Sequence, residues 1–110
     1  MIARTWVGVT LAEKSEEYWE YLQKTGLPDY RATPGFLGIT VQRRVADGRA
    51  EFVLTTFWDS MESIRAFAGE DVERARYYSE DAEFLVAMEP LVVHRELLAW
   101  PGEDAAPGKE

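Results

Sequence analysis

Alternating apolar and polar positions from Gly35 to Trp58 predict a β-hairpin, and the other predicted elements are arranged around it. Asp47-Gly48 separates two β-rich runs, and this dipeptide suits a two-residue type I′ turn because both positions need positive φ. The turn then sets the register of the two strands. The expected cross-strand pairs are Arg44 with Glu51, Val41 with Leu54, Ile39 with Thr56 and Leu37 with Trp58.

The two faces of this hairpin differ in chemistry. One face is largely apolar with a single charge at Arg43, and we expect it to face the core: Leu37, Ile39, Val41, Val45, Ala50, Phe52, Leu54, Thr56 and Trp58. The other face mixes polar residues with Phe36, Val53 and Phe57. Because that face is too aromatic for a bare surface, we expect it to meet a partner.

Further elements are predicted on both sides of the hairpin. Residues 2–11 alternate as a half-buried strand, with Ala3, Thr5, Val7, Val9 and Leu11 expected to face the core. A helix is expected from about Glu13 to Thr25, opened by a capping box at Thr10 and ended by Gly26 and Leu27-Pro28. The predicted elements after the hairpin are a helix from Asp59 or Ser60 to Gly69, a short or broken helix over residues 70–78, a helical turn from Ser79 that ends before Pro90, and a last strand over residues 91–100.

This order of elements defines the expected fold class. It is α+β, a ferredoxin-like β-α-β-β-α-β arrangement whose four-stranded antiparallel sheet is covered by helices on one face. We expect a single domain over residues 1–100 and a flexible tail over residues 101–110. The uncovered face would carry Trp6, Phe36, Val53 and Phe57, so the simplest assembly is a homodimer in which two sheets pack face to face as a dimeric α+β barrel.

Composition narrows the range of functions. A chain of 110 residues supports one core and one pocket, and the absence of cysteine removes disulfides, thiolate nucleophiles and thiolate metal sites. A formal net charge of -8 argues against nucleic-acid binding, which needs clustered Lys and Arg. The amino end lacks a signal peptide and no window is apolar enough to span a bilayer, so we expect a cytoplasmic protein without membrane contact.

Four stretches occur in order between Ile2 and Leu98: Arg4-Thr5-Trp6, Thr33 to Gly38, Phe57 to Phe67, and Pro90 to His94. Together they resemble the antibiotic biosynthesis monooxygenase group of the dimeric α+β barrel superfamily. The resemblance implies a pocket between sheet and helices, where cofactor-free members hold a polycyclic aromatic substrate that reacts directly with molecular oxygen. A phenol that loses a proton becomes an electron-rich anion, so the protein needs only to bind, orient and desolvate it and to assist proton transfer. The sequence shows no metal or flavin motif, and no cofactor is expected.

Haem-degrading relatives are a second possibility within this superfamily. The resemblance implies an Asn in their first strand, a Trp at the end of the third and a His ligand in the helical region that follows. Trp58 matches the Trp, but the first-strand position falls near Thr5, and the stretch Arg74 to Tyr78 contains no His. We therefore do not expect haem degradation.

Seven side chains are candidates for the pocket. Trp58, Tyr77 and His94 are candidates for catalytic roles, and Thr5, Phe67, Tyr78 and Arg43 are candidates for substrate binding. Each also has a structural interpretation. The indole of Trp58 could stack on a flat ligand or fill the core, Thr5 could donate a hydrogen bond or simply pack, and the two tyrosines could orient a substrate or pack. Arg43 could steady an anion at a pocket rim or extend to solvent.

His94 is the one side chain whose ordinary pKa suits proton transfer near neutrality. Its face on the last strand is ambiguous, because neither alternating set of residues there is cleanly polar. If Glu96 pairs with Arg4 on the first strand, His94 faces the partner and is structural; otherwise it is a candidate base.

Two functions remain open on this basis. The first is a cofactor-independent monooxygenase that acts on an aromatic or hydrophobic small molecule, and the second is a non-catalytic small-ligand-binding or accessory dimer. A pocket lined by Trp58, Tyr77 or Tyr78 and a titratable group would favour the enzyme. An interface filled by side chains would favour the second function.

Overall fold

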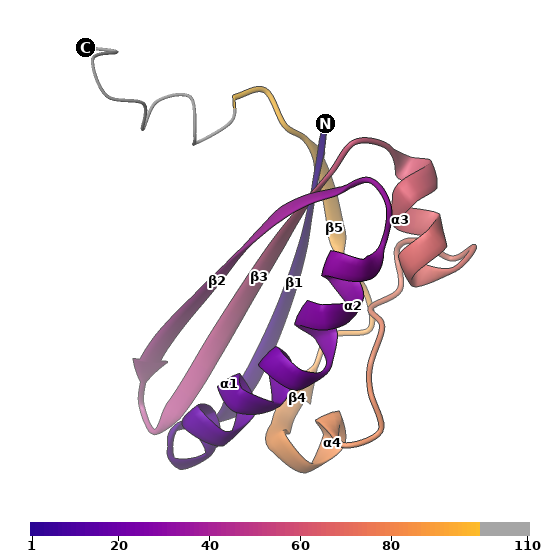
Figure 1. Cartoon of the computed structure of the whole chain (residues 1–110). Coiled ribbons are helices and arrows are strands. Elements are labelled where there is room, and N and C mark those ends of the chain that lie inside the picture. The colour runs from indigo at the N-terminus through magenta and orange to yellow at the C-terminus, as the bar shows by residue number, and fades with distance from the viewer. Residues whose placement is uncertain (100–110) are drawn as a thin grey trace.

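A computed structural model describes residues 1–99, which form an antiparallel sheet with helices against one face (Figure 1). The elements are β1 (Ile2–Leu11), a 3-10 turn η1 (Ala12–Lys14), α1 (Ser15–Lys24), α2 (Gly26–Ala32), β2 (Phe36–Ala46), β3 (Arg49–Trp58), α3 (Met61–Ala68), α4 (Asp81–Phe84), β4 (Leu85–Met88) and β5 (Val93–Glu96). The strand order is β2-β3-β1-β4, and β5 also pairs with β1. The α+β, ferredoxin-like fold class is confirmed, with five strands instead of four. The tail predicted over residues 101–110 and the end of the predicted last strand at Trp100 lie outside the described residues.

The hairpin of β2 and β3 confirms the predicted turn and most of the predicted register. Asp47 and Gly48 have φ values of 53° and 75°, and Arg44 lies opposite Glu51. The predicted pairing of Leu37 with Trp58 is wrong, because the register shifts between Phe36 and Gly38 and Phe36 lies opposite Trp58. The rings of Phe36 and Trp58 are 5.4 Å apart, and Leu37 is turned out to 44% exposure.

The predicted faces of β1 are wrong. Trp6 lies opposite Leu54 and Gly8 opposite Phe52, so the set with Arg4, Trp6, Gly8 and Thr10 faces the helices and is buried. The valines of β1 misled the prediction because β-branched residues suit strands on either face. The indole of Trp6 lies so close over Gly8 that a Cβ there would collide with it. Leu11 and Val45, both predicted to face the core, are exposed.

The first helical region contains two helices where one was predicted. The capping box is absent, since the Thr10 hydroxyl donates to the Leu11 carbonyl and makes no cap. The predicted end of the helix near Thr25 is confirmed, because α1 ends at Lys24. Gly26 and Leu27-Pro28 do not stop helical structure, however, since Gly26 opens α2, which runs to Ala32. A proline is tolerated there because the first-turn N–H groups of a helix have no partner within it.

The region after the hairpin is less helical than predicted. Ser60 caps α3 by accepting from the backbone N–H of Ser63, and Gly69, with φ of 91°, follows its end, as predicted. Residues 70–78 form no helix, α4 is a single turn, and β4 occupies residues predicted as helix. Residues 85–88 form a strand instead of a helix because they pair with the free edge of β1, and this tertiary contact overrides the local helical pattern. No helix among residues 1–99 is long and apolar enough to cross a membrane.

Candidate functional site

A cavity lies between the core face of β1 and β3 and the helices. Arg4 and Trp6 come from β1, Tyr18 from α1 and Tyr30 from α2, while Asp81 opens α4. Arg76, Tyr77 and Tyr78 close it from the irregular segment between α3 and α4. The side chains leave a volume of about 20 Å³. We call residues 70–80 the cover segment.

Polar contacts hold the cover segment over the cavity. The Tyr78 hydroxyl donates to Asp29 Oδ2 at 2.6 Å, and Arg76 Nη2 contacts the same oxygen at 3.3 Å. Arg76 Nη1 also donates to the carbonyl of Phe67 at 3.1 Å. Asp29 therefore anchors the cover segment to α2 through two side chains.

Tyr77 connects the cover segment to the sheet. Trp6 Nε1 donates to the Tyr77 hydroxyl at 3.1 Å, and that hydroxyl donates to the carbonyl of Glu89. The rings of Trp6 and Tyr77 meet edge to face at 6.0 Å. Burial raises the pKa of Tyr77, so its phenol stays protonated and can donate near neutrality.

Arg4 is a buried cation at the base of the cavity. It is 2% exposed, its Nη2 donates to the Arg74 carbonyl at 3.0 Å, and its Nε has no hydrogen-bond partner among residues 1–99. Its guanidinium carbon lies 5.7 Å from the centre of the Phe67 ring. Burial lowers the pKa of Arg4, and the neighbouring phenol of Tyr30 partly offsets this effect. Arginine nevertheless stays charged in proteins.

Asp81 is the buried carboxyl group of the cavity. It accepts from the backbone N–H of Tyr78 and from the Tyr18 hydroxyl at 3.5 Å, and it is 3% exposed. Burial raises the pKa of Asp81. A carboxylate with a raised pKa is a better proton acceptor than an exposed one.

His94 lies on the helix side of the sheet. It is directly opposite Arg4 in the register of β1 and β5, and Glu96 is opposite Ile2, so the pairing of Glu96 with Arg4 does not form. Burial and the charge of Arg4 lower the pKa of His94, and Nε2 has no partner in the described part of the chain. The imidazole is therefore neutral at pH 7.

Trp58 and Phe67 form an aromatic wall beside the cavity. Trp58 is 0% exposed, and its Nε1 donates to the Thr56 hydroxyl at 2.8 Å. The Phe67 ring stacks on Tyr30 at 4.4 Å and lies 5.8 Å from Trp58. Both side chains are buried in the hydrophobic core, where they support the ring of Tyr30, which lines the cavity.

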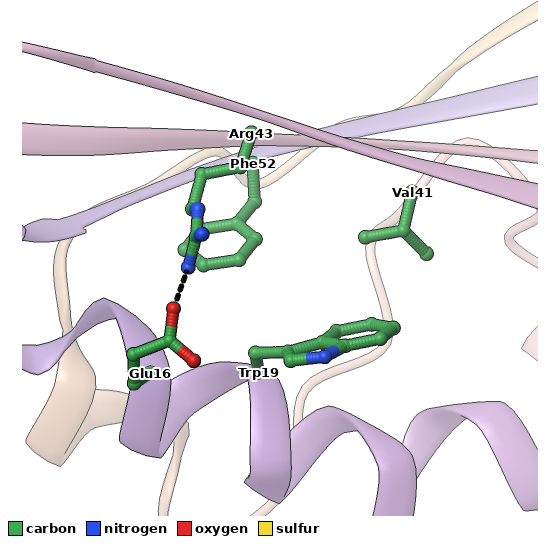
Figure 2. A pocket seen from close by; sticks show the side chains of 5 residues that line it. All are labelled: Glu16, Trp19, Val41, Arg43 and Phe52. Atoms are coloured by element: carbon green, nitrogen blue, oxygen red, sulfur yellow. Dashed lines mark hydrogen bonds and ion pairs between the residues drawn. The ribbon is translucent and has the colours of Figure 1, made fainter.

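Of the seven predicted residues, Tyr77 and Tyr78 line the cavity, whereas Trp58, Phe67 and His94 do not line it. The other two, Thr5 and Arg43, lie in different parts of the molecule. Thr5 is on the opposite face of the sheet, 3.4 Å from the Thr55 hydroxyl, in a hollow of about 370 Å³ that also contacts Val7 and Glu89. Arg43 pairs with Glu16 at 2.5 Å beside a second pocket of about 270 Å³. Figure 2 shows this pocket between α1 and the hairpin, with the ion pair at one end and the indole of Trp19 along one wall.

The cavity residues that sequence reasoning missed include Arg4, Trp6, Tyr30 and Asp81. The first two were assigned to the wrong face of β1, and the other two lie in regions whose local structure was predicted incorrectly. A signal was present for Arg4, since a charged residue inside an apolar alternating strand requires an explanation. No group of three or more His, Cys, Asp or Glu residues that could hold a metal occurs within residues 1–99.

A sheet covered by helices on one face, with a cavity between the two layers, defines a ferredoxin-like α+β protein. Residues 8–75, more than half of the chain, match the family described as antibiotic biosynthesis monooxygenase. The chain belongs to this family. No curated protein is a significant match to the sequence.

Solved structures share the fold. A candidate antibiotic biosynthesis monooxygenase from Nitrosomonas europaea is 16% identical, with a TM-score of 0.61 over 90% of this chain and 100% of that one. Another from Bacillus cereus is 15% identical, with a TM-score of 0.62 over 90% and 96%. The haem degrader MhuD from Mycobacterium tuberculosis, with two haems in its active site, is 16% identical, with a TM-score of 0.60 over 90% and 97%. These identities establish likeness of fold alone.

Proposed function

We propose that the protein is a cofactor-independent monooxygenase that acts on an aromatic or otherwise hydrophobic small molecule in the cavity between sheet and helices. The observation that carries this proposal is the convergence of aromatic rings with titratable groups: Trp6, Tyr30 and Tyr77 line the same cavity as Asp81 and Arg4. Membership of the antibiotic biosynthesis monooxygenase family supports it. Ligand pockets typically combine apolar walls with a few polar groups in this way.

The reaction requires only proton transfer and positioning from the protein. Asp81 accepts the proton of a phenolic substrate, and the resulting anion passes an electron to oxygen. The reduced oxygen then bonds to a ring carbon that bears hydrogen, and the peroxide takes back the proton held by Asp81. Loss of water from this hydroperoxide leaves a carbonyl. One oxygen atom enters the product and the other leaves as water, while all four electrons come from the substrate.

The other candidate residues take supporting parts in this proposal. Tyr77 and Tyr78 on the cover segment orient the substrate oxygen, and Trp58 and Phe67 shape the aromatic wall. His94, opposite Arg4 on β5, is the second candidate for the proton acceptor. Thr5 and Arg43 lie outside the cavity and take no part.

Access to the cavity requires movement of the cover segment. The free volume of about 20 Å³ holds no aromatic ring. The cover segment has no regular helix or strand over residues 70–78. It is held by side-chain contacts to Asp29, Phe67 and Glu89, and by backbone hydrogen bonds to residues 90–92 on one side. Exchanging those contacts for contacts with water or substrate would open the cavity.

Oxygen uptake with a panel of polycyclic phenols and quinols tests the proposal. We expect uptake by the wild type, and a loss of about 100-fold or more in Asp81→Asn, which cannot accept a proton. Asp71→Asn is the matched control, because Asp71 is exposed and its one ion pair within residues 1–99 is to Arg74 on the same segment. Absence of uptake across the panel would overturn the proposal.

A second function is favoured by one observation, the nearly filled interface between sheet and helices. A non-catalytic small-ligand-binding or accessory protein needs a fitted cavity but no base. Binding of panel members without oxygen uptake, and with equal affinity in Asp81→Asn, would support this alternative.

Haem is not proposed as a ligand. The described residues that line the cavity include no His that could ligate the iron. We expect added hemin to give no defined axial-ligand spectrum and no reductant-dependent loss of its Soret band. A stoichiometric His-ligated complex would contradict this expectation.

A further inference from the structure

Arg4 differs from Arg43, Arg74 and Arg76, because no ion pair to a carboxylate holds its side chain within residues 1–99. Arg43 pairs with Glu16, Arg74 with Asp71 and Arg76 with Asp29, all at 3.3 Å or less. Those three side chains are substantially exposed, whereas Arg4 is almost fully buried. No ion pair to Arg4 occurs within residues 1–99, and its Nε lacks any hydrogen bond there.

The groups that contact Arg4 directly are polar or aromatic and carry no balancing charge, and Asp81, which lines the same cavity, forms no ion pair with Arg4 within residues 1–99. The Phe67 ring lies under the guanidinium, the Arg74 carbonyl accepts one hydrogen bond, and the Tyr30 phenol lies beside it. Burial raises the pKa of Tyr30, so that phenol is neutral at pH 7. His94 is the residue directly across the sheet, and it too is neutral there.

A buried guanidinium without a counter-charge destabilises a folded protein unless it is satisfied in another way. A cation–π contact, one carbonyl and the Tyr30 hydroxyl satisfy only part of a group with five N–H donors, and the Nε donor has no partner within residues 1–99. Such an arrangement is typical of binding sites, where the missing negative charge arrives with the ligand. Arg4 lines the cavity, so a ligand that enters beneath the cover segment would meet this cation.

We propose that Arg4 is an anion-binding residue and that the ligand of this cavity is a planar aromatic molecule carrying an oxyanion, as a phenolate, enolate or carboxylate. The oxyanion accepts from the guanidinium, and the ring packs among Trp6, Tyr30 and Tyr77. This inference rests on the proposed function for the aromatic nature of the substrate, and it adds that the substrate carries a negative charge on oxygen. In that reaction Arg4 stabilises the substrate anion after the proton has left, and it binds the substrate without accepting the proton.

Two probes of the same shape test whether the cavity prefers a negatively charged ligand. Naphthalene-2-carboxylate is an anion and naphthalene-2-carboxamide is its neutral counterpart, and binding of each is followed by tryptophan fluorescence and calorimetry. We expect the wild type to bind the carboxylate about tenfold more tightly or better. Arg4→Met should bind the two probes within about twofold of each other, because charge and donors are lost while the shape is kept. Arg31→Gln, an exposed arginine of α2, is the control and should keep the preference.

Thermal unfolding without ligand separates a binding role from a structural one. If Arg4 is held for a ligand, Arg4→Met should have a Tm equal to or above that of the wild type, since a buried unpaired charge is removed. A lower Tm together with an unchanged preference for the carboxylate would overturn the proposal. So would equal binding of both probes, or no binding of either, by the wild type. A clear preference for the carboxylate without oxygen uptake from any phenol would retain the anion site and reject the monooxygenase.

Discussion

At the scale of single residues, the cavity depends on polar atoms carried by aromatic side chains. The Tyr77 hydroxyl accepts from Trp6 and donates to the carbonyl of Glu89, so it is satisfied while the cover segment is closed. A substrate can engage this hydroxyl only by replacing one of these partners. The closed form is therefore a resting state, in which Tyr77 and Trp6 satisfy each other until a ligand enters.

Trp58 provides a prediction about stability. Replacing it with Ala should lower the free energy of unfolding by about 3–5 kcal/mol, because the indole is completely buried among three other rings and holds the Thr56 hydroxyl. Urea unfolding followed by circular dichroism measures the change. Trp19→Ala is the control and should cost less, since Trp19 is only partly buried. Equal losses would contradict the assigned role of Trp58.

His94 provides a prediction about pH. Because the pKa of His94 is lowered in the folded state, the unfolded chain takes up this proton first as pH falls below about 6.5. The neutral imidazole therefore contributes its full stabilisation at pH 8, and this contribution is lost as the pH falls below about 6.5. Arg4 strengthens the shift, and Glu73 opposes it. The Tm of the wild type should fall more than that of His94→Gln between pH 8 and pH 5.5, and parallel curves would show that the pKa is ordinary.

At the scale of elements, the cover segment is held by α2 through one carboxylate. Asp29→Asn weakens the contacts to Tyr78 and Arg76, so the amides of residues 74–79 should exchange with deuterium about three to ten times faster. The amides of β3 should not change. Asp71→Asn is the matched control, because its ion pair lies within the cover segment. Unchanged exchange in Asp29→Asn would show that other contacts hold the cover segment.

The elements that could be predicted from sequence are those whose signals are local. Asp47-Gly48 defines its turn and Ser60 caps α3 through contacts within four residues, so both were predicted correctly. The bulge at Leu37 and the faces of β1 depend on which strands pair, and alternation alone does not reveal this. Strand β4 forms because an edge of β1 is free. The cavity combines these non-local choices, which is why its main residues were missed.

At the scale of the whole molecule, one face of the sheet has no helix over it in the described structure (Figure 1). Of the residues predicted for a dimer contact there, Trp6 and Phe36 instead pack in the core cluster. The set that alternates away from the helices on β1 and β3 is Thr5, Val7, Val9, Val53, Thr55 and Phe57. A homodimer through this face remains our proposal, with the contact centred on the cross-strand pair Val7 and Val53.

Light scattering at micromolar concentration tests the assembly. We expect twice the 12.6 kDa mass of the chain for the wild type. The double variant Val7→Asp with Val53→Asp should dissociate or aggregate, since it places two charges in the contact. Val45→Asp is the control, because Val45 is already exposed at the end of the hairpin. A wild-type monomer would rule out both the dimer and the barrel.

The break between β4 and β5 has a consequence for such an assembly. Glu89 follows β4, and its carbonyl accepts from Tyr77 on the cavity side while the residue also lines the hollow on the uncovered face. A second subunit seated in that hollow would press on the same short loop that anchors the cover segment. Ligand affinity and subunit affinity would then be thermodynamically linked, each changing the other by the same factor. Diluting the protein would in that case loosen its hold on the ligand, even though no ligand contact crosses the interface.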